Sequence, residues 1–280
     1  MADEAQTEIG RVTALWRYPV KSMLGEELNA TGVTERGLLG DRMYGLVDRA
    51  DGKVATAKNP RTWPNLLDYR AAFVDPPSCD APTPPVRITM PDGTTVTTTQ
   101  WDRDQILSQA LHREVTLTAT DQREGENVVS VSEKYWLDME DPDYRDTVTD
   151  FELPAGTFFD CGVVHLLTTA TLDRMRALYP EGRFEVRRFR PNIVVENANG
   201  GEGFVENGWT GQTLAIGDEV RLHISRLCTR CVMTTLAQGD LPKDIGILRT
   251  VARHNRAHLG VYASVLRGGR IYRGDAISLA

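Results

Sequence analysis

The stretch Arg226-Leu-Cys-Thr-Arg-Cys-Val-Met-Thr-Thr235 contains two of the chain's four cysteines, three residues apart and with arginines among them. A thiolate beside fixed positive charge suits a metal, or a cofactor that carries negative charge. The sequence on either side is rich in predicted strands. Residues 209–223 alternate turns and strands, and further strands are expected at residues 260–266, 269–272 and 277–279. The cysteine pair therefore belongs to a predominantly β part of the fold.

Four interpretations of the cysteine pair compete. A structural zinc site needs about four ligands, and no second CxxC or matching histidine pair accompanies this one. A thioredoxin-like redox pair needs a helix after the motif, whereas Val232–Thr235 looks extended. The pair also fits two inert buried cysteines, or a single thiolate ligand on a soft metal with Arg226 and Arg230 offsetting its charge. The motif by itself leaves all four open.

Length and composition are those of an ordinary globular protein with one large domain or two modest ones. The 280 residues are 41% hydrophobic and 25% charged, and the formal net charge is −7. This balance argues against nucleic-acid binding through an overall basic surface. Four cysteines make no disulfide framework, the acidic N-terminus does not resemble a signal peptide, and no apolar run is long enough to span a membrane. We therefore expect a cytoplasmic protein without nucleic-acid or membrane partners.

The first half of the chain has the pattern of a small barrel or sandwich. Short runs of strand-forming residues recur, and Asp51-Gly52 between two of them is a hairpin signal. One helix is predicted at residues 101–111. Strands are expected at residues 12–16, 44–47, 54–55, 69–74, 86–90, 94–99 and 115–118.

The second half mixes strands with helices. A strand at residues 163–167 is followed by a helix at residues 172–179, with Thr169 or Thr171 as its expected cap. Residues 189–195 predict a turn into a strand, and residues 241–258 are mostly helical.

The expected fold class is α+β and strand-rich, with two domains. The segment between them is acidic and poorly periodic, and Asp138–Asp146 within it predicts a surface loop or a lid over an active site. The expected divisions are an N-terminal β-barrel-like domain over residues 1–120, a connecting segment that is partly loop over 121–160, and a second β-barrel domain with a few helices over 161–280.

Cationic residues are concentrated in short motifs of both halves. Tyr18-Pro-Val-Lys-Ser22 places an ammonium and a hydroxyl after a strand, a pair that suits an oxyanion such as phosphate. Arg42 and the run Thr56–Arg61 add cations to the same half. In the other half, Arg188 and Arg190 would share a face if they alternate along a strand. Each arginine alone is more often a surface residue, but together the motifs predict an anion pocket.

Five motifs in this order resemble those of one known family. They are Tyr18-Pro-Val-Lys-Ser22, Gly40-Asp-Arg42, Phe189-Arg-Pro-Asn-Ile-Val194, Cys228-Thr-Arg-Cys-Val-Met-Thr-Thr235 and Gly274-Asp275. Together they resemble a MOSC-domain protein with its N-terminal MOSC β-barrel domain. The resemblance is to the branch that contains the mitochondrial amidoxime-reducing component and the bacterial reductases of N-hydroxylated base analogues. It extends from about Val12 to Leu279.

The resemblance implies a molybdenum cofactor, a pterin dithiolene with a terminal phosphate (Mo-molybdopterin). Its metal ligand in the family corresponds to Cys231, which is also the implied catalytic residue. Lys58 stands where the family has arginine, so the charge is kept but the two-pronged hydrogen bonding is lost. The implied cofactor-binding residues are Lys21, Ser22, Arg42, Thr56, Lys58, Thr168, Thr169, Arg190, Asn192 and Thr229.

The implied activity is reduction of N-hydroxylated small molecules, such as amidoximes, hydroxylamines or N-hydroxylated bases. Bacterial relatives often carry a C-terminal [2Fe–2S] domain, and this sequence ends at Ala280 with no cysteine after Cys231. We therefore expect electrons from a separate donor, such as a ferredoxin-, flavodoxin- or cytochrome b5-like protein with its reductase. Two alternatives stay open: a molybdenum-free sulfur-transfer or carbon–sulfur-cleaving enzyme that uses Cys231 as nucleophile or persulfide carrier, and a non-catalytic cofactor carrier.

Overall fold

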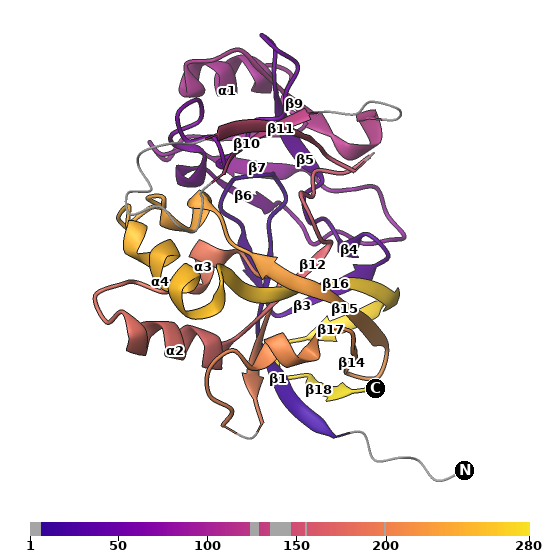
Figure 1. Ribbon diagram of the computed structural model, residues 1–280. Coiled ribbons are helices and arrows are strands. Elements are labelled where there is room, and N and C mark those ends of the chain that lie inside the picture. The colour runs from indigo at the N-terminus through magenta and orange to yellow at the C-terminus, as the bar shows by residue number, and fades with distance from the viewer. Residues whose placement is uncertain (1–6, 124–128, 135–146, 155, 199) are drawn as a thin grey trace.

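The computed structural model describes residues 7–123, 129–134, 147–154, 156–198 and 200–280. The expected loop or lid at Asp138–Asp146 lies outside these residues. Figure 1 shows most of the first half of the chain, in indigo to magenta, stacked on a barrel formed mainly by the second half. The strand-rich α+β prediction is confirmed.

Among the described residues, seven strands close into a barrel because the first strand of the chain pairs with strands from the C-terminal half on both sides. This first strand also carries the short strand β2 (Glu26–Leu28) at its C-terminal end. Around the barrel the order is β13 (Ile193–Asn197), β12 (Val164–Thr168), β16 (His258–Arg267), β15 (Val220–Thr229), β14 (Thr213–Ile216), β18 (Ala276–Leu279) and β1 (Glu8–Arg17).

The barrel interior is apolar because each strand turns alternate residues inward. Val12, Leu15, Leu222 and Ile224 are among its buried side chains, each at most 1% exposed. Val12 and Leu15 come from β1, so the first strand contributes to the core of the barrel and not to that of the N-terminal half. The expected division at residues 1–120 stays a prediction.

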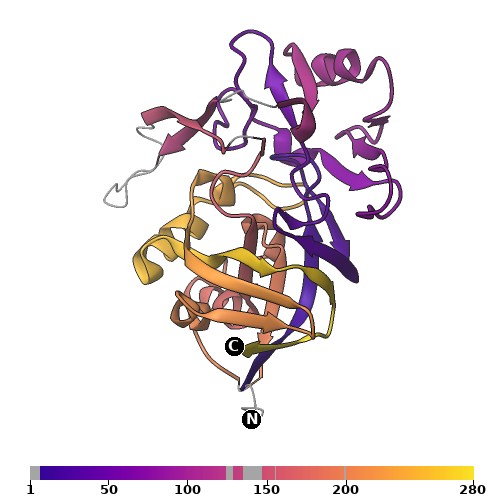
Figure 2. The ribbon, with the colours of Figure 1, turned by 90° about the vertical axis from the view of Figure 1, so that its right-hand side faces the viewer.

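The upper half of the molecule in Figure 1, formed mostly by the N-terminal half of the chain, contains a second hydrophobic core built from short antiparallel sheets. Figure 2 shows the hairpin of β10 and β11 projecting from it. This hairpin occupies the connecting segment, where the sequence pattern gave no strand signal. The elements are β5 (Tyr44–Asp48), η1 (Leu66–Asp68), β6 (Arg70–Phe73), β7 (Val86–Thr89), β8 (Thr95–Thr97), α1 (Arg103–Leu111), β9 (Val115–Ala119), η2 (Thr120–Arg123), β10 (Val129–Lys134) and β11 (Thr147–Glu152).

Two further connections tie the halves together. The sheet of β17 (Gly269–Tyr272), β3 (Ala30–Thr34) and β4 (Gly37–Leu38) joins chain segments more than two hundred residues apart. In addition, Val232 and Leu236, which follow the cysteine pair, are buried in the hydrophobic core of the upper half. The cysteine pair therefore lies where the two halves meet.

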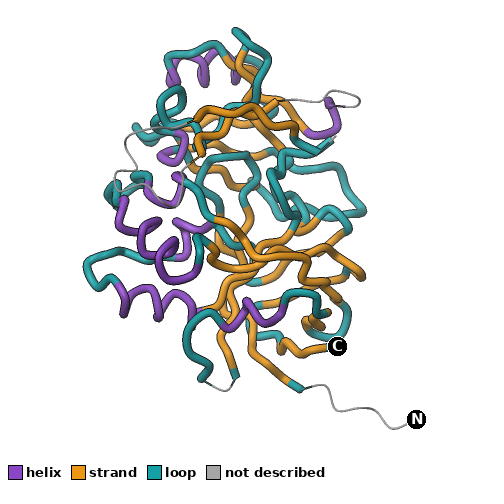
Figure 3. Tube along the Cα trace, viewed as in Figure 1, coloured by secondary structure: helices purple, strands orange, loops and turns teal. Residues whose placement is uncertain are grey.

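The helices of the second half pack along one side of the barrel (Figures 1 and 3). Leu172, Met175, Ile247 and Val251 are buried there in a third core. Helix α2 begins earlier than predicted because Thr168, and not Thr169 or Thr171, is its cap, accepting from the Thr171 amide at 3.1 Å. The elements are α2 (Thr169–Leu178), α3 (Val186–Phe189), η3 (Val205–Trp209), η4 (Val232–Thr235) and α4 (Ile245–Asn255). None of the described helices is long and apolar enough to cross a membrane.

Two local predictions are wrong. Arg188 and Arg190 do not alternate along a strand, since α3 ends at Phe189 and Arg190 follows in the left-handed conformation at φ 53°. Val232–Thr235 is a 3₁₀ turn and not an extended segment. In both places the local pattern was overruled by tertiary packing: Arg188 and Phe189 are fully buried, and so are Val232 and Thr234.

Candidate cofactor site at the junction of the two halves

One pocket at the junction of the halves collects most of the predicted site residues; we call it the junction pocket. Its volume is about 120 Å³. The predicted residues in its wall are Lys21, Ser22, Arg42, Lys58, Arg190, Asn192, Thr229 and Cys231. The others in the wall are Phe158, Phe159, Asp160, Cys161, Gly162, His165, Phe189, Arg230, Met233 and Tyr262.

Three of the predicted residues hold the backbone conformation that disfavours L side chains. Ser22, Arg42 and Arg190 have φ angles of 63°, 48° and 53°. Each such residue costs of the order of 1 kcal/mol, and such strain persists where surrounding structure determines it. The sharp turns aim side chains from both halves at one point. Backbone strain and predicted cofactor contacts thus coincide.

The Tyr18 ring is the support for two of the pocket's cations. The guanidinium carbons of Arg190 and Arg42 lie 4.1 and 4.6 Å from its centroid. The Tyr18 hydroxyl donates to the Pro191 carbonyl at 3.2 Å, and burial raises the pKa of Tyr18. Burial also lowers the pKa of Arg190 to about 10, although the group stays charged at neutral pH. Arg190 donates to the Met23 carbonyl at 2.5 Å, which links the halves.

Asp41 connects the cations to the amide of the second half. Its carboxylate accepts from the Tyr18 amide at 2.7 Å, from the Asn192 side-chain amide at 2.9 Å, and from Arg42. The Asn192 side-chain oxygen in turn accepts from the His165 backbone at 3.1 Å. Asn192 is 1% exposed, so these bonds fix its orientation. These hydrogen bonds indicate that Asn192 stabilises the wall of the junction pocket.

Asp160 is a site residue that the sequence reasoning missed. It forms ion pairs with both Lys21 and Lys58, the latter at 2.8 Å. Burial alone would raise the pKa of Asp160, but the two ammonium groups hold it far below its usual range. Burial lowers the pKa of Lys21, whereas the charges of Asp160 and Cys231 outweigh burial and raise that of Lys58. The only available signal was a carboxylate between two phenylalanines and a cysteine, just before a buried strand.

Thr56 lies behind the pocket and not in its wall. Its hydroxyl accepts from the Lys58 amide at 3.2 Å and shapes the turn that presents Lys58. The Ser22 hydroxyl accepts from the Ala57 amide at 3.0 Å, so the two loops of the N-terminal half are bonded to each other. Thr56 thereby acts on the site through the backbone, and direct contact with a cofactor stays a prediction.

Thr168 and Thr169 are not in the wall of the junction pocket either. The Thr168 hydroxyl, like that of Thr171, donates to the buried carboxylate of Glu206 at 2.7 Å. Thr169 instead lines a separate pocket between α2 and the glycine-rich turn that ends at Gly203. Their role as cofactor contacts stays a prediction.

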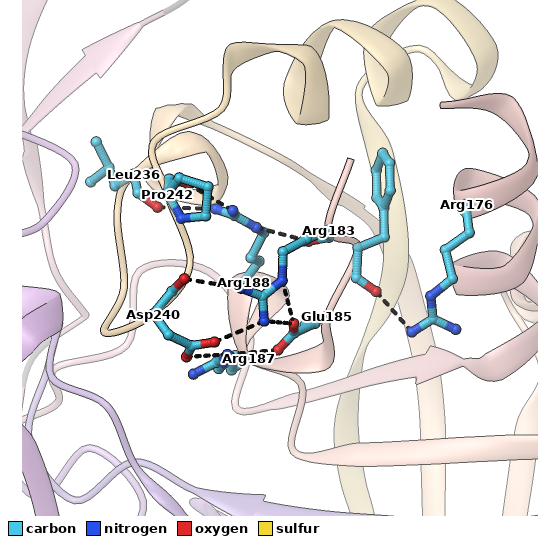
Figure 4. Close-up of polar contacts among 9 residues, drawn as sticks. Arg176, Arg183, Glu185, Arg187, Arg188, Leu236, Asp240 and Pro242 are labelled. Atoms are coloured by element: carbon cyan, nitrogen blue, oxygen red, sulfur yellow. Dashed lines mark hydrogen bonds and ion pairs between the residues drawn. The ribbon is translucent and has the colours of Figure 1, made fainter. Parts of the chain in front are cut away.

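The loop that follows Cys231 is held by a buried guanidinium (Figure 4). Arg188, fully buried in α3, donates to the carbonyls of Thr234, Leu236 and Pro242 at 3.3, 3.0 and 2.8 Å, and to that of Arg183 at 2.9 Å. Nearby, Arg183 and Arg187 share the carboxylates of Glu185 and Asp240. These bonds fix the path of the chain immediately after the cysteine.

The chemistry of the junction pocket fits an anionic cofactor. Five cationic side chains and one carboxylate line it. The volume of 120 Å³ is below the ~300–1,000 Å³ usual for small-molecule sites, so the pocket would enclose only part of such a cofactor. Within the described ranges no three His, Cys, Asp or Glu side chains are grouped to hold a metal.

This fold and pocket define a strand-rich, two-part protein with a cation-lined site beside a cysteine. The MOSC domain matches residues 155–278, and the MOSC N-terminal beta barrel domain matches residues 9–138. The chain therefore belongs to the MOSC-domain proteins that carry the N-terminal MOSC β-barrel domain. It is 26% identical over 248 residues to mitochondrial amidoxime reducing component 2 of Rattus norvegicus, covering 82% of this chain and 67% of the relative.

Two solved structures show a looser likeness. The YUAD protein from Bacillus subtilis has a TM-score of 0.47 at 11% identity, over 96% of this chain and 94% of that one. YiiM from Geobacillus stearothermophilus has a TM-score of 0.34 at 13% identity, over 56% of this chain and 74% of that one. TM-scores this low establish neither a shared fold nor a shared activity.

Proposed function

We propose that this protein is a molybdenum-cofactor-dependent reductase of N-hydroxylated small molecules. The observation that carries the proposal is the junction pocket, where Cys231 lies in one wall with cations from both halves of the chain. A soft thiolate is the ligand type that suits the metal, and the cations suit the cofactor's phosphate. The similarity to an amidoxime reducing component supports the choice of substrate class.

When bound, the cofactor supplies two-electron oxygen-transfer chemistry. The chain's own residues bind and orient it. Arg42 and Arg190, held against the Tyr18 ring, are positioned to donate hydrogen bonds to the cofactor's phosphate. Lys21 and Lys58, paired with Asp160, can exchange that carboxylate for a bound anion. Phe159 and Met233 keep part of the wall apolar, which strengthens these electrostatic contacts.

The electrons would come from a separate donor protein of the ferredoxin, flavodoxin or cytochrome b5 class. In the balanced reaction two electrons and two protons convert the N–OH group to N–H and release water. The four cysteines are free, which fits a reducing compartment, and the cytoplasm is our proposed location.

Anaerobic turnover of benzamidoxime with a chemical electron donor tests the proposal. Wild type and the exposed-cysteine control Cys79→Ser should both reduce it, while Cys231→Ala should lose activity by at least a hundredfold, as expected when a metal ligand is removed. Full activity in Cys231→Ala would overturn the ligand assignment.

A sulfur-transfer activity is the second candidate, because Cys161 and Cys231 line the same pocket. In that case Cys231 would carry a persulfide, and Lys58 would stabilise its negative charge. Mass spectrometry after incubation with a sulfane-sulfur donor, such as a polysulfide that leaves as the shorter thiolate, separates the two proposals: a sulfur adduct on Cys231 in molybdenum-free protein favours sulfur transfer. A pure carrier would contain molybdenum yet show no turnover.

A further inference from the structure

Helix α4 exposes a row of arginines. Its inner side is apolar, with Ile247 and Val251 buried in the third core. Arg249 and Arg253 are exposed and lie four residues apart, so they share the outer face of the helix. Arg256, also exposed, follows at the C-cap. Figure 1 shows α4 on the outside of the molecule. We call these three arginines the basic face of α4.

The charge of this face contrasts with that of the whole chain. Residues 245–274 include six arginines and no aspartate or glutamate, although acidic residues outnumber basic ones by 39 to 32 in the full sequence. Within the described part of the chain, the side chains of Arg253 and Arg256 have no ion-pair partner. The helix dipole favours cations in the last turn, but Arg249 lies before that turn. The face therefore suits an acidic partner.

Both ends of α4 are hydrogen-bonded to the segment that contains Cys231. At the N-terminal end, the Asp244 amide donates to the Thr235 carbonyl at 2.8 Å. At the C-terminal end, the Arg230 amide donates to the Ala257 carbonyl at 2.7 Å.

The bond at the C-terminal end of α4 limits how far the basic face is from the proposed metal ligand. Ala257 directly follows Arg256, and Arg230 directly precedes Cys231. The covalent lengths along this path place the Cα atoms of Arg256 and Cys231 at most about 15 Å apart. The basic face is thus close to the proposed metal ligand and bonded to its segment at both ends.

We propose that the basic face of α4 is the docking surface for the electron donor, and that the donor is a small redox protein with an acidic surface. The inference rests on the proposed function, because it names where and by what charge the separate donor binds. Each docked one-electron donor is oxidised by one electron. Two such deliveries, with two protons from water, convert N–OH to N–H and release water. Electrostatic attraction steers the encounter, so binding weakens as salt screens it.

The first test measures binding without turnover. Fluorescence anisotropy at low salt gives the Kd of three acidic redox proteins, a [2Fe–2S] ferredoxin, a flavodoxin and the soluble domain of a cytochrome b5. The test variant combines Arg253→Glu with Arg256→Glu. The control makes the same charge change at two exposed arginines elsewhere, with Arg87→Glu in β7 and Arg267→Glu at the end of β16.

We expect at least one donor to bind wild type and the control alike, and to bind the test variant about 10-fold or more weakly. Added salt should weaken binding to wild type and affect the test variant little. No binding by any donor, or equal losses in test variant and control, would overturn the inference. Binding to vesicles of anionic phospholipid but to none of the donors would assign the face to a membrane instead. If the test variant does not fold, Arg253→Gln with Arg256→Gln replaces it under the same criteria.

The second test separates docking from a structural role of the helix. Benzamidoxime reduction is measured with the donor that binds most tightly and, separately, with dithionite as a chemical donor. The test variant should raise the KM for the protein donor by about 10-fold or more and leave the dithionite-driven rate unchanged. A similar loss with both donors would overturn the inference. If wild type shows no turnover even with dithionite, the proposed function fails, while the binding measurements still decide the docking surface.

Discussion

Arg190 lies over the ring of Tyr18, with its guanidinium carbon 4.1 Å from the ring centroid, and Arg42 lies over the same ring at 4.6 Å. One arginine comes from each half of the chain. Because Tyr18 is 1% and Arg190 5% exposed, the ring and this cation are shielded from water, which strengthens the attraction between them. The stacking on Tyr18 holds the two halves of the chain together and also fixes the positions of Arg42 and Arg190 in the pocket.

Substitution of Tyr18 should therefore affect stability and binding together. Tyr18→Phe removes the hydroxyl bond to Pro191 and should lower the free energy of unfolding by about 1 kcal/mol. Tyr18→Leu removes the ring and should lower it by about 3 kcal/mol, with a fall in molybdenum content. Urea unfolding and metal analysis measure the two effects. Equal losses in both variants would show that the ring contributes nothing as a support for cations.

Removal of the Asp160 charge leaves the buried Lys21 and the partly buried Lys58 without their carboxylate. At pH 7, Asp160→Asn should lower the free energy of unfolding by about 2 kcal/mol. The pKa of Asp160 in the folded protein lies below its unfolded value of about 3.9, so the ion pairs stabilise fully above that pH and less as the pH falls through the folded value. The difference between variant and wild type should shrink below about pH 4.

The matched control is Asp150→Asn, which breaks the exposed pair between Asp150 and Lys53. Its stability should stay close to that of wild type at every pH. A difference for Asp160→Asn that does not narrow in acid would contradict the assignment of its charge.

Glu206 is predicted to respond to pH in the opposite direction. Burial raises its pKa, although Thr168 and Thr171 donate to one of its oxygens. A carboxyl with a raised folded pKa stabilises fully below its unfolded pKa and loses that contribution as the pH rises. Glu206→Gln should therefore unfold at a higher urea concentration than wild type at pH 7, with the advantage fading toward pH 4. If Glu206→Gln is less stable than wild type at pH 7, and the loss of stability does not shrink in acid, this explanation is excluded.

Arg188 should be essential for the loop after Cys231. Arg188→Met leaves four carbonyls without their donor in a buried place and should lower the free energy of unfolding by about 3 kcal/mol or more. Arg187→Met, in the same helix but on the partly exposed ion-pair network, should change little. Thermal melts and limited proteolysis of residues 234–242 compare the two. Similar melting temperatures and similar cleavage rates for the two variants would show that Arg188 does not hold the loop in place.

Most of the groups that meet at the pocket could be predicted from the sequence, because the chemistry of a side chain depends on its residue type and not on the fold. Lysines and arginines grouped in short turn motifs suit an anion, and a cysteine among them suits a soft metal, whatever the fold. The hairpin at Asp51-Gly52 and the helix at Arg103–Leu111 were also predictable, since both depend on local signals.

The long-range relations could not be predicted in this way. Asp160 gives no local sign that it will pair with Lys21 and Lys58, which are about a hundred residues or more away in the chain. Arg188, in a short helix, donates to carbonyls of a loop that is distant in the chain, and no periodicity encodes that. Such contacts follow from tertiary packing alone.

The central claim is that the junction pocket holds a molybdenum cofactor with Cys231 as the protein's metal ligand. The most direct test is to measure molybdenum and pterin in folded wild-type protein produced in a host that makes the cofactor. We predict molybdenum and pterin in equal amounts, approaching one of each per chain, and a loss of both in a variant that combines Arg42→Ala with Arg190→Ala. Folded wild-type protein that contains neither would contradict the account.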